Sequence, residues 1–135
     1  MIINDRPDVA LLAGADGVHL GQTDLAAPQV RRLVGRQLLI GVSTSNLTQA
    51  KRAQIEGADY CGVGPMFATT TKHKPVLAGP DYLKQYVAWN SLPHLAIGGI
   101  TPANLPELVA AGARAVPLSR PLRAAADRAG VVRNM

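Results

Sequence analysis

The sequence is poor in residue types that several protein classes require. Cys61 is its only cysteine, which excludes an internal disulfide framework and fits a reducing, cytoplasmic compartment. Charged residues make up only 17% of the 135 residues and hydrophobic residues 47%, a balance that argues against a disordered chain. No apolar run approaches the roughly 20 residues of a membrane-spanning helix, and Met1–Asp5 lack signal-peptide features. We expect one cytoplasmic domain over residues 1–135 that does not bind a membrane.

The excess of basic residues does not by itself indicate nucleic-acid binding. The net charge is +5, but the basic residues are scattered, and their densest groups fall on predicted helices: Arg31, Arg32 and Arg36, and Arg120, Arg123 and Arg128. One Phe, one Trp and three Tyr residues leave little aromatic surface for stacking on bases. The charge therefore predicts a solvated basic surface first and a preference for anionic substrates second, without a nucleic-acid partner.

A short motif occurs three times, and each copy predicts the end of a helix and the start of a strand. The copies are Gly14–Val18, Gly57–Cys61 and Gly112–Val116. Each copy follows an Ala/Leu-rich segment of helical period and precedes a short apolar run. Glycine ends helices because it adopts the left-handed conformation without steric cost. The repeat therefore predicts alternating helices and strands.

The predicted strands are short and continuously apolar, as expected for parallel strands covered on both faces. They cover residues 1–3, 17–20, 38–42, 60–63, 95–97 and 115–118. The predicted helices cover residues 8–11, 26–34, 46–56, 80–87, 102–111 and 121–129. Asn46 and Thr101 are predicted N-caps, with Pro102 at the first helical position. This alternation predicts an α/β fold with a parallel sheet.

Two α/β architectures fit this pattern, the doubly wound sheet and the (β/α)8 TIM barrel. No G-x-G-x-x-G motif follows the first strand, which weakens the dinucleotide-binding alternative. Small or polar residues follow every strand, which suits a barrel with its site at one rim. A complete barrel needs at least about 200 residues. We therefore predict an incomplete (β/α)8 TIM barrel of about six βα units, with the preceding units missing.

Two aspartates occupy equivalent positions after neighbouring predicted strands. Asp5 follows the first strand and Asp24 the second, so both carboxylates should lie at the same rim. Two hard oxygen ligands, with room for water and phosphate, would suit Mg²⁺. Alternatively, each aspartate is a helix N-cap, and position alone favours neither interpretation.

Three further loops contain groups that can bind anions. Thr69-Thr70-Thr71-Lys72 supplies three hydroxyls and an ammonium, although an ordinary polar surface loop explains this segment equally well. Gly98-Gly99 permits either a close backbone approach to a ligand or a tight turn. Together with Ser119, these glycines offer backbone N–H groups near helix starts, which suits phosphate.

Other reactive side chains form no recognisable constellation. His19 and Cys61 fall within predicted strands and are expected to be packed, and His73 and His94 have no evident acid–base partner. Covalent catalysis and a zinc site are therefore not indicated.

Six stretches, in this order, resemble the thiamine phosphate synthase family. They are Ile3–Arg6, Gly14–Asp24, Gly41–Ser43, Gly57–Phe67, Thr69–Lys72 and Ala96–Asn104. Each is modest alone, but the ordered set is specific. The family joins hydroxymethylpyrimidine diphosphate to thiazole phosphate, giving thiamine phosphate and diphosphate. The resemblance implies a Mg²⁺-dependent transferase of thiamine biosynthesis with small phosphorylated substrates, and it leaves a homo-oligomer open.

The resemblance also implies the roles of individual residues. Asp5 and Asp24 would bind Mg²⁺, and Ser43 and Lys72 would be the catalytic residues. The residues expected to contact the pyrimidine diphosphate are Asn4, Ser43 and Lys72. The residues expected around the thiazole phosphate are Thr69, Thr70, Thr71, Gly99, Ser119 and Arg120. Mg²⁺ and Lys72 would stabilise the charge on the leaving diphosphate.

The sequence also departs from the family pattern. A Gln/Arg/Lys motif that grips the diphosphate is absent, Pro117 interrupts the sixth predicted strand, and Arg120 replaces an expected small residue. The alternatives are therefore an inactive fragment, a phosphate-ligand-binding module or a relative of the thiazole tautomerases. Tautomerases use a histidine after the third strand, where this chain has Ser43-Thr44-Ser45, which favours the synthase.

Overall fold

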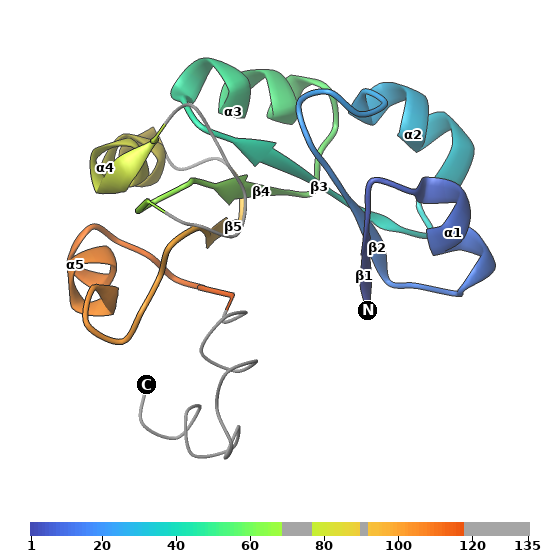
Figure 1. Ribbon diagram of the computed structural model, residues 1–135. Helices are drawn as coiled ribbons and strands as arrows, with labels where there is room; N and C mark the ends of the chain where they lie inside the picture. Colours follow the sequence, from blue (N-terminus) through green and yellow to red (C-terminus); the bar gives the residue numbers. More distant parts are fainter. Residues whose placement is uncertain (69–76, 90–91, 118–135) are drawn as a thin grey trace, which may run out of the picture.

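The computed structural model describes residues 1–68, 77–89 and 92–117 (Figure 1). Strands and helices alternate along the described chain. Their order is β1 (Ile2–Asn4), α1 (Pro7–Leu12), β2 (Gly17–Leu20), α2 (Ala27–Val34), β3 (Leu39–Thr44), α3 (Leu47–Ile55), β4 (Tyr60–Val63), α4 (Gly79–Trp89), β5 (His94–Ala96) and α5 (Leu105–Ala110). No described helix is long and apolar enough to cross a membrane.

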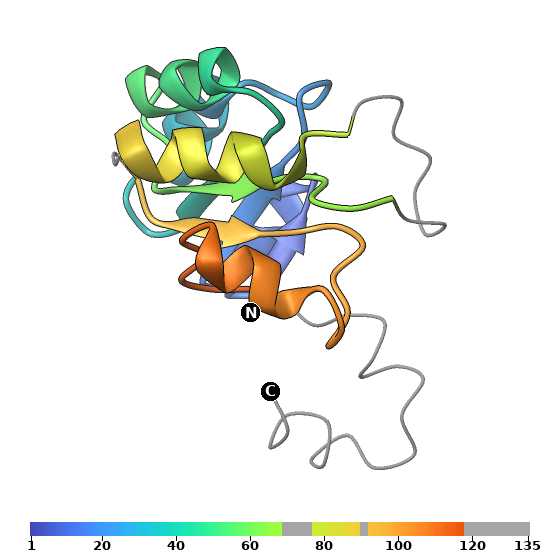
Figure 2. The same ribbon diagram turned by 90° about the vertical axis from the view of Figure 1, so that its left-hand side faces the viewer.

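The strands form one parallel sheet in the order β1-β2-β3-β4-β5. A doubly wound sheet reverses its strand order, so this sequential order is not of that kind. The helices follow the outer side of the curved sheet (Figure 1), and α3, α4 and α5 succeed one another along it (Figure 2). The predicted α/β class with a parallel sheet is confirmed.

The two faces of the sheet differ in how the described residues cover them. Seven apolar side chains face the helices and are buried, namely Val18, Leu20, Ile40, Val42, Cys61, Val63 and Ala96. On the other face, Ile2, Leu39 and Ile97 remain 43%, 50% and 42% exposed. The prediction that both faces are covered therefore holds, within the described residues, for the outer face alone.

The three copies of the repeated motif form the same backbone structure. Gly14, Gly57 and Gly112 all have positive φ, at 59°, 85° and 97°. Each glycine N–H bonds back three residues, and the N–H of the following alanine bonds back five, as in Ala58 N to Ala53 O at 3.0 Å. This pair of bonds is the Schellman motif, which satisfies the last carbonyl groups of a helix. The predicted helix ends are confirmed.

The sixth predicted βα unit is not confirmed. Residues 115–117 are not a strand, and a single bond, from the Ala96 N–H to the Ala115 carbonyl at 2.9 Å, joins them to β5. Pro117 has no N–H with which to continue a ladder. Leu118 and the predicted helix at 121–129 lie outside the described residues. The described chain thus contains five strand–helix units rather than about six.

Of the two predicted N-caps, Asn46 caps its helix, whereas Thr101 caps a turn that precedes its helix. The Asn46 side chain accepts a hydrogen bond from the Gln49 N–H at 3.0 Å, so it caps α3. Thr101 does not begin α5, which starts at Leu105. Its carbonyl accepts the N–H groups of Asn104 and Leu105, at 3.2 and 3.0 Å, which forms a separate turn before the helix. The Thr101 hydroxyl accepts the Asn104 N–H at 3.4 Å and the Asn104 side chain accepts the Thr101 N–H at 2.8 Å, so Thr101 caps this turn.

Candidate functional site

The predicted site residues that the structure describes all lie at the carboxyl ends of strands. Asn4 ends β1 and Asp5 follows it, Asp24 lies in the loop after β2, Ser43 is near the end of β3, and Gly99 follows β5. These ends share one edge of the parallel sheet, as predicted. The remaining candidates, Thr69, Thr70, Thr71, Lys72, Ser119 and Arg120, lie outside the described residues.

Asp5 has an unusual backbone conformation. Its φ is 65°, in the left-handed region that few residues other than glycine adopt. The Arg6 N–H donates to the Asn4 carbonyl at 2.8 Å, closing a three-residue turn around Asp5, whose own N–H donates to the His19 carbonyl at 2.9 Å. Such turns are strained, and strain of this kind concentrates at functional sites. The backbone of the exposed Asp5 is therefore held in this conformation, directly after β1, at a conformational cost.

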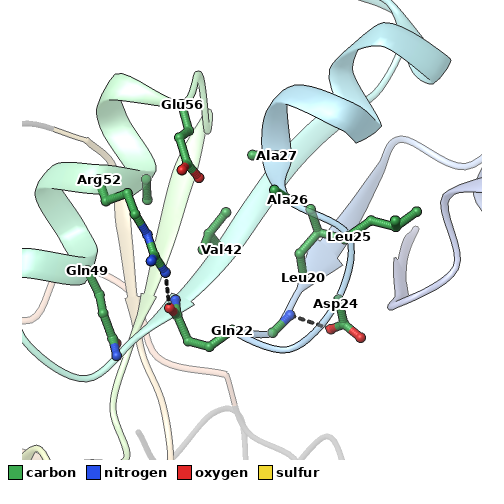
Figure 3. Close-up of a pocket in the computed structure, with 12 residues that line it drawn as sticks. Leu20, Gln22, Asp24, Leu25, Ala26, Ala27, Val42, Gln49, Arg52 and Glu56 are labelled. Carbon is green, nitrogen blue, oxygen red and sulfur yellow. Dashed lines mark hydrogen bonds between the residues drawn. The ribbon is translucent and has the colours of Figure 1, made fainter.

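Asp24 organises the loop after β2. One of its carboxylate oxygens accepts the Gly21 N–H at 2.6 Å (Figure 3). The N-cap positions of α1 and α2 are Arg6 and Ala26, so neither Asp5 nor Asp24 is a helix cap, and that alternative is wrong. Within the described residues, no three His, Cys, Asp or Glu side chains form a metal-binding group.

A cavity of about 160 Å³ lies beside the Asp24 loop, between that loop and α3 (Figure 3). Its polar lining residues are Gln22, Asp24, Gln49, Arg52 and Glu56. Arg52 donates to the Gln22 side-chain carbonyl, and the Gln22 amide donates to the Ser43 carbonyl at 2.6 Å. The lining includes neither His19 nor the Ser43 side chain. We place the candidate site at the strand ends and on the inner face of the sheet, because four of the five described candidates do not line this cavity.

A polar cluster crosses the inner face of the sheet. The His19 imidazole lies between two hydroxyls, with Nδ1 3.0 Å from the Tyr60 oxygen and Nε2 2.9 Å from Ser43 Oγ. Burial raises the pKa of Tyr60, which favours its protonated form. His19 is packed, as predicted, but its bond to Ser43 was not predicted. Period-two alternation in β2 and β3 places both side chains on one face and could have suggested it.

The glycines after β5 fold that loop against the loop after β4. Gly98 and Gly99 have φ values of 100° and 67°. A Cβ at Gly99 would lie 2.6 Å from the Phe67 carbonyl oxygen, closer than real Cβ atoms approach. The Asn104 amide donates to the Gly99 carbonyl at 2.9 Å and fixes the turn. The tight turn predicted for Gly98-Gly99 is confirmed. The close approach that the structure shows at Gly99 is to the backbone of Phe67, and the predicted approach to a ligand stays a prediction.

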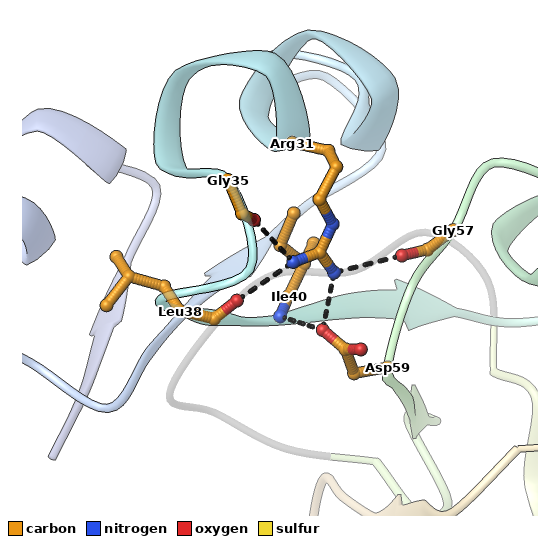
Figure 4. Close-up of polar contacts among 6 residues, drawn as sticks. All are labelled: Arg31, Gly35, Leu38, Ile40, Gly57 and Asp59. Carbon is orange, nitrogen blue, oxygen red and sulfur yellow. Dashed lines mark hydrogen bonds and ion pairs between the residues drawn. The ribbon is translucent and has the colours of Figure 1, made fainter.

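The opposite ends of the strands carry a structural ion pair instead of a cluster of site residues (Figure 4). Arg31 donates to the carbonyls of Gly35, Leu38 and Gly57 at 3.0–3.1 Å and to Asp59 Oδ2 at 2.6 Å. The same Asp59 oxygen accepts the N–H of Ile40 at 2.7 Å. This network joins the end of α2 to the starts of β3 and β4. The predicted site residues and this structural network therefore lie at different ends of the sheet.

Comparison with known proteins places these features in one family. Residues 1–122 match the profile of a family described as thiamine monophosphate synthase. Thiamine-phosphate synthases of Thermosynechococcus vestitus and Pelotomaculum thermopropionicum are 46% and 48% identical, over 99% and 98% of this chain. The chain spans 38% and 61% of their respective lengths. The structure of thiamine phosphate pyrophosphorylase from Pyrococcus furiosus superposes with a TM-score of 0.87 and 32% identity, covering 98% of this chain and 63% of that one. The chain belongs to the thiamine monophosphate synthase family.

Proposed function

We propose that the protein acts as a thiamine phosphate synthase, joining hydroxymethylpyrimidine diphosphate to thiazole phosphate with release of diphosphate. The observation that carries the proposal is the family match over residues 1–122, a stretch that contains both aspartates, Ser43 and Lys72. The location of Asp5, Asp24 and Ser43 at one edge of the sheet supports it. For the whole protein we propose a (β/α)8 barrel, which the sequential parallel strand order supports. We also propose that it acts in the cytoplasm.

The chain's own groups fit Mg²⁺ at the proposed site. Asp5 and Asp24 supply hard carboxylate oxygens from loops that follow adjacent strands, and the Asp5 N–H bonds directly to β2. Mg²⁺ is commonly held by one or two carboxylates together with substrate phosphates, so two aspartates are sufficient. When bound, the ion would supply Lewis-acid stabilisation of negative charge on the diphosphate.

The proposed reaction needs binding and orientation more than proton transfer. The bond between the pyrimidinylmethyl carbon and the diphosphate oxygen breaks, and its electron pair leaves with the diphosphate. The lone pair of the thiazole nitrogen then forms the new bond to that carbon. Ser43 and Lys72 would hold the diphosphate, and the hydroxyls of Thr69–Thr71 the thiazole phosphate. The nucleophilic nitrogen has no proton to lose, so no general base is required.

Conservative variants of the two aspartates test the proposal. We expect Asp5→Asn and Asp24→Asn to lower thiamine phosphate formation in the presence of Mg²⁺ on the order of 100-fold. Asparagine tolerates the left-handed conformation of Asp5, so the first variant removes charge with little change in backbone conformation. Asp81→Asn, at an exposed position of α4, is the matched control and should retain activity.

Two results would contradict the proposal. If the unmodified chain forms no product but binds the pyrimidine diphosphate with Mg²⁺ in calorimetry, it is a phosphate-ligand-binding module. If both aspartate variants retain activity, the proposed metal ligands are wrong.

A further inference from the structure

We propose that His19 is a positioning residue for Ser43, that Tyr60 selects its tautomer, and that together they hold the Ser43 hydroxyl as a donor toward an anionic substrate group. The inference deepens the proposed function and rests on it for the identity of that group. Its structural basis is the hydrogen-bonded row Tyr60–His19–Ser43, whose members come from β4, β2 and β3.

Sheet register and glycine residues make this row possible. His19 pairs with Gly41, and Gly41 pairs with Tyr60, so positions 19, 41 and 60 lie side by side across the sheet. Ser43 lies two residues after Gly41 on the same face of β3. A side chain at Gly41 would overlap the Tyr60 ring, and a Cβ at Gly62 would lie 3.0 Å from His19 Cε1. The two glycines therefore leave the space in which Tyr60 and His19 meet.

The imidazole transmits the direction of hydrogen bonding from one hydroxyl to the other. A neutral imidazole has one donor and one acceptor nitrogen, so the partner of Nδ1 determines what Nε2 does. If Tyr60 donates to Nδ1, then the Nε2–H donates to Ser43 Oγ, and the serine proton can point to a ligand. In the reverse order, Ser43 uses its proton on Nε2.

Two observations favour donation from Tyr60. A phenol, with a pKa near 10, is a stronger hydrogen-bond donor than an aliphatic hydroxyl, and burial of Tyr60 favours its protonated form. In addition, His19 is the only hydrogen-bond partner of the Tyr60 hydroxyl among residues 1–68, 77–89 and 92–117. The reverse order would leave the Tyr60 proton without an acceptor in this part of the chain.

The resulting arrangement suits an anion. Phosphate and diphosphate oxygens at neutral pH are mainly hydrogen-bond acceptors, so a serine that already accepts from His19 presents the complementary group. A serine that donates to His19 would present lone pairs to a negative charge. His19 acts here through Ser43, without contact with the reacting atoms.

The tautomer of His19 can be measured without any activity. We expect ¹⁵N NMR of the imidazoles to show His19 protonated at Nε2 and not at Nδ1, with the signal assigned by its loss in His19→Asn. Tyr60→Phe should remove this preference. Tyr82→Phe removes another buried hydroxyl, one that bonds Thr44 at 2.7 Å, and should leave the His19 signal unchanged. Protonation at Nδ1 in the unmodified chain would overturn the proposal even if the protein proved inactive.

Kinetics then separate positioning from general packing. Glutamine can place its amide nitrogen near the position of Nε2, whereas asparagine is too short. We expect His19→Asn and Ser43→Ala each to lower kcat/KM by about 10-fold, and His19→Gln to retain most activity. The double variant His19→Asn/Ser43→Ala should be no worse than Ser43→Ala alone. Additive losses, or equal losses in the Gln and Asn variants, would reject the positioning role, while absence of product from the unmodified chain would reject only the proposed function.

Discussion

The Arg31 side chain joins the end of α2 to the starts of β3 and β4. Its planar guanidinium reaches three carbonyls and one carboxylate on different segments, and it is only 27% exposed. Lysine has the same charge but lacks the fork of donors. We expect Arg31→Lys to lower the free energy of unfolding by about 1–2 kcal/mol, measured by urea denaturation.

The adjacent arginine provides the control for this substitution. Arg32 is exposed on the same helix, and Arg32→Lys should change stability by less than about 0.5 kcal/mol. Equal effects of the two variants would show that the Arg31 network contributes nothing specific.

At the residue scale, position could be predicted from the sequence but conformation could not. The place of Asp5 and Asp24 after adjacent strands follows from the order of apolar runs. The positive φ of Asp5 does not, because it depends on the bond from the Arg6 N–H to the Asn4 carbonyl and on the bond from the Asp5 N–H to His19 in β2. The bond from the Gly21 N–H to Asp24 likewise could not be predicted, and it excludes the helix cap that was one of the two alternatives for this residue.

At the element scale, α3 offers a direct test of local capping. The Asn46 side chain satisfies the Gln49 N–H, one of the free donors of the first turn. We expect Asn46→Ala to lower the free energy of unfolding by about 1 kcal/mol, and Asn46→Asp to retain stability, because aspartate caps equally well. Thr48→Ala, at an exposed position in the same turn, should not destabilise the protein, and a loss as large as that of Asn46→Ala would contradict a capping effect.

Elements determined by local chemistry were predicted well. The helix ends at Gly14, Gly57 and Gly112 follow from what glycine permits in any protein. The sixth predicted strand does not form over residues 115–117. A strand needs a continuous series of backbone hydrogen bonds to its neighbour, and Pro117 has no N–H to donate. The start of α5 was misplaced because the Thr101 carbonyl supports a turn before the helix, which a capping pattern alone does not reveal.

At the scale of the whole molecule, His94 should make stability depend on pH. Burial, with a smaller effect of Arg114, lowers the pKa of His94 below its ordinary value of 6.5. Its buried Nε2 has no hydrogen-bond partner among the described residues. As pH falls below about 6.5, the unfolded chain binds a proton that the folded chain resists, so the free energy of unfolding decreases.

Thermal denaturation between pH 7 and pH 5 measures this dependence. We expect Tm to fall across this range, and the slope to be smaller in His94→Phe, which keeps a ring against Tyr86. Two aspartates also have a lowered pKa, Asp8 at about 2 and Asp16. Their contributions to the free energy of unfolding are lost at more acidic pH, so they should not obscure the effect of His94. An unchanged slope in the variant would assign the pH dependence to other groups.

The hydrogen-bonded row Tyr60–His19–Ser43 is a property of the whole sheet, because it forms only when β2, β3 and β4 are in register. Its members, at positions 19, 43 and 60, are far apart in the sequence, and each is unremarkable within its own strand. Sequence patterns indicated the sheet and its order of strands. They did not indicate which inward side chains would meet, since this depends on register and on the space left by Gly41 and Gly62.

The repeated helix ends have a consequence for how this chain can change. All three are closed by backbone hydrogen bonds, so they constrain the glycine while leaving most neighbouring side chains open to substitution. These three joints should therefore tolerate substitution of the side chains around them. The glycines at 14, 57 and 112 are the positions that any such change must retain.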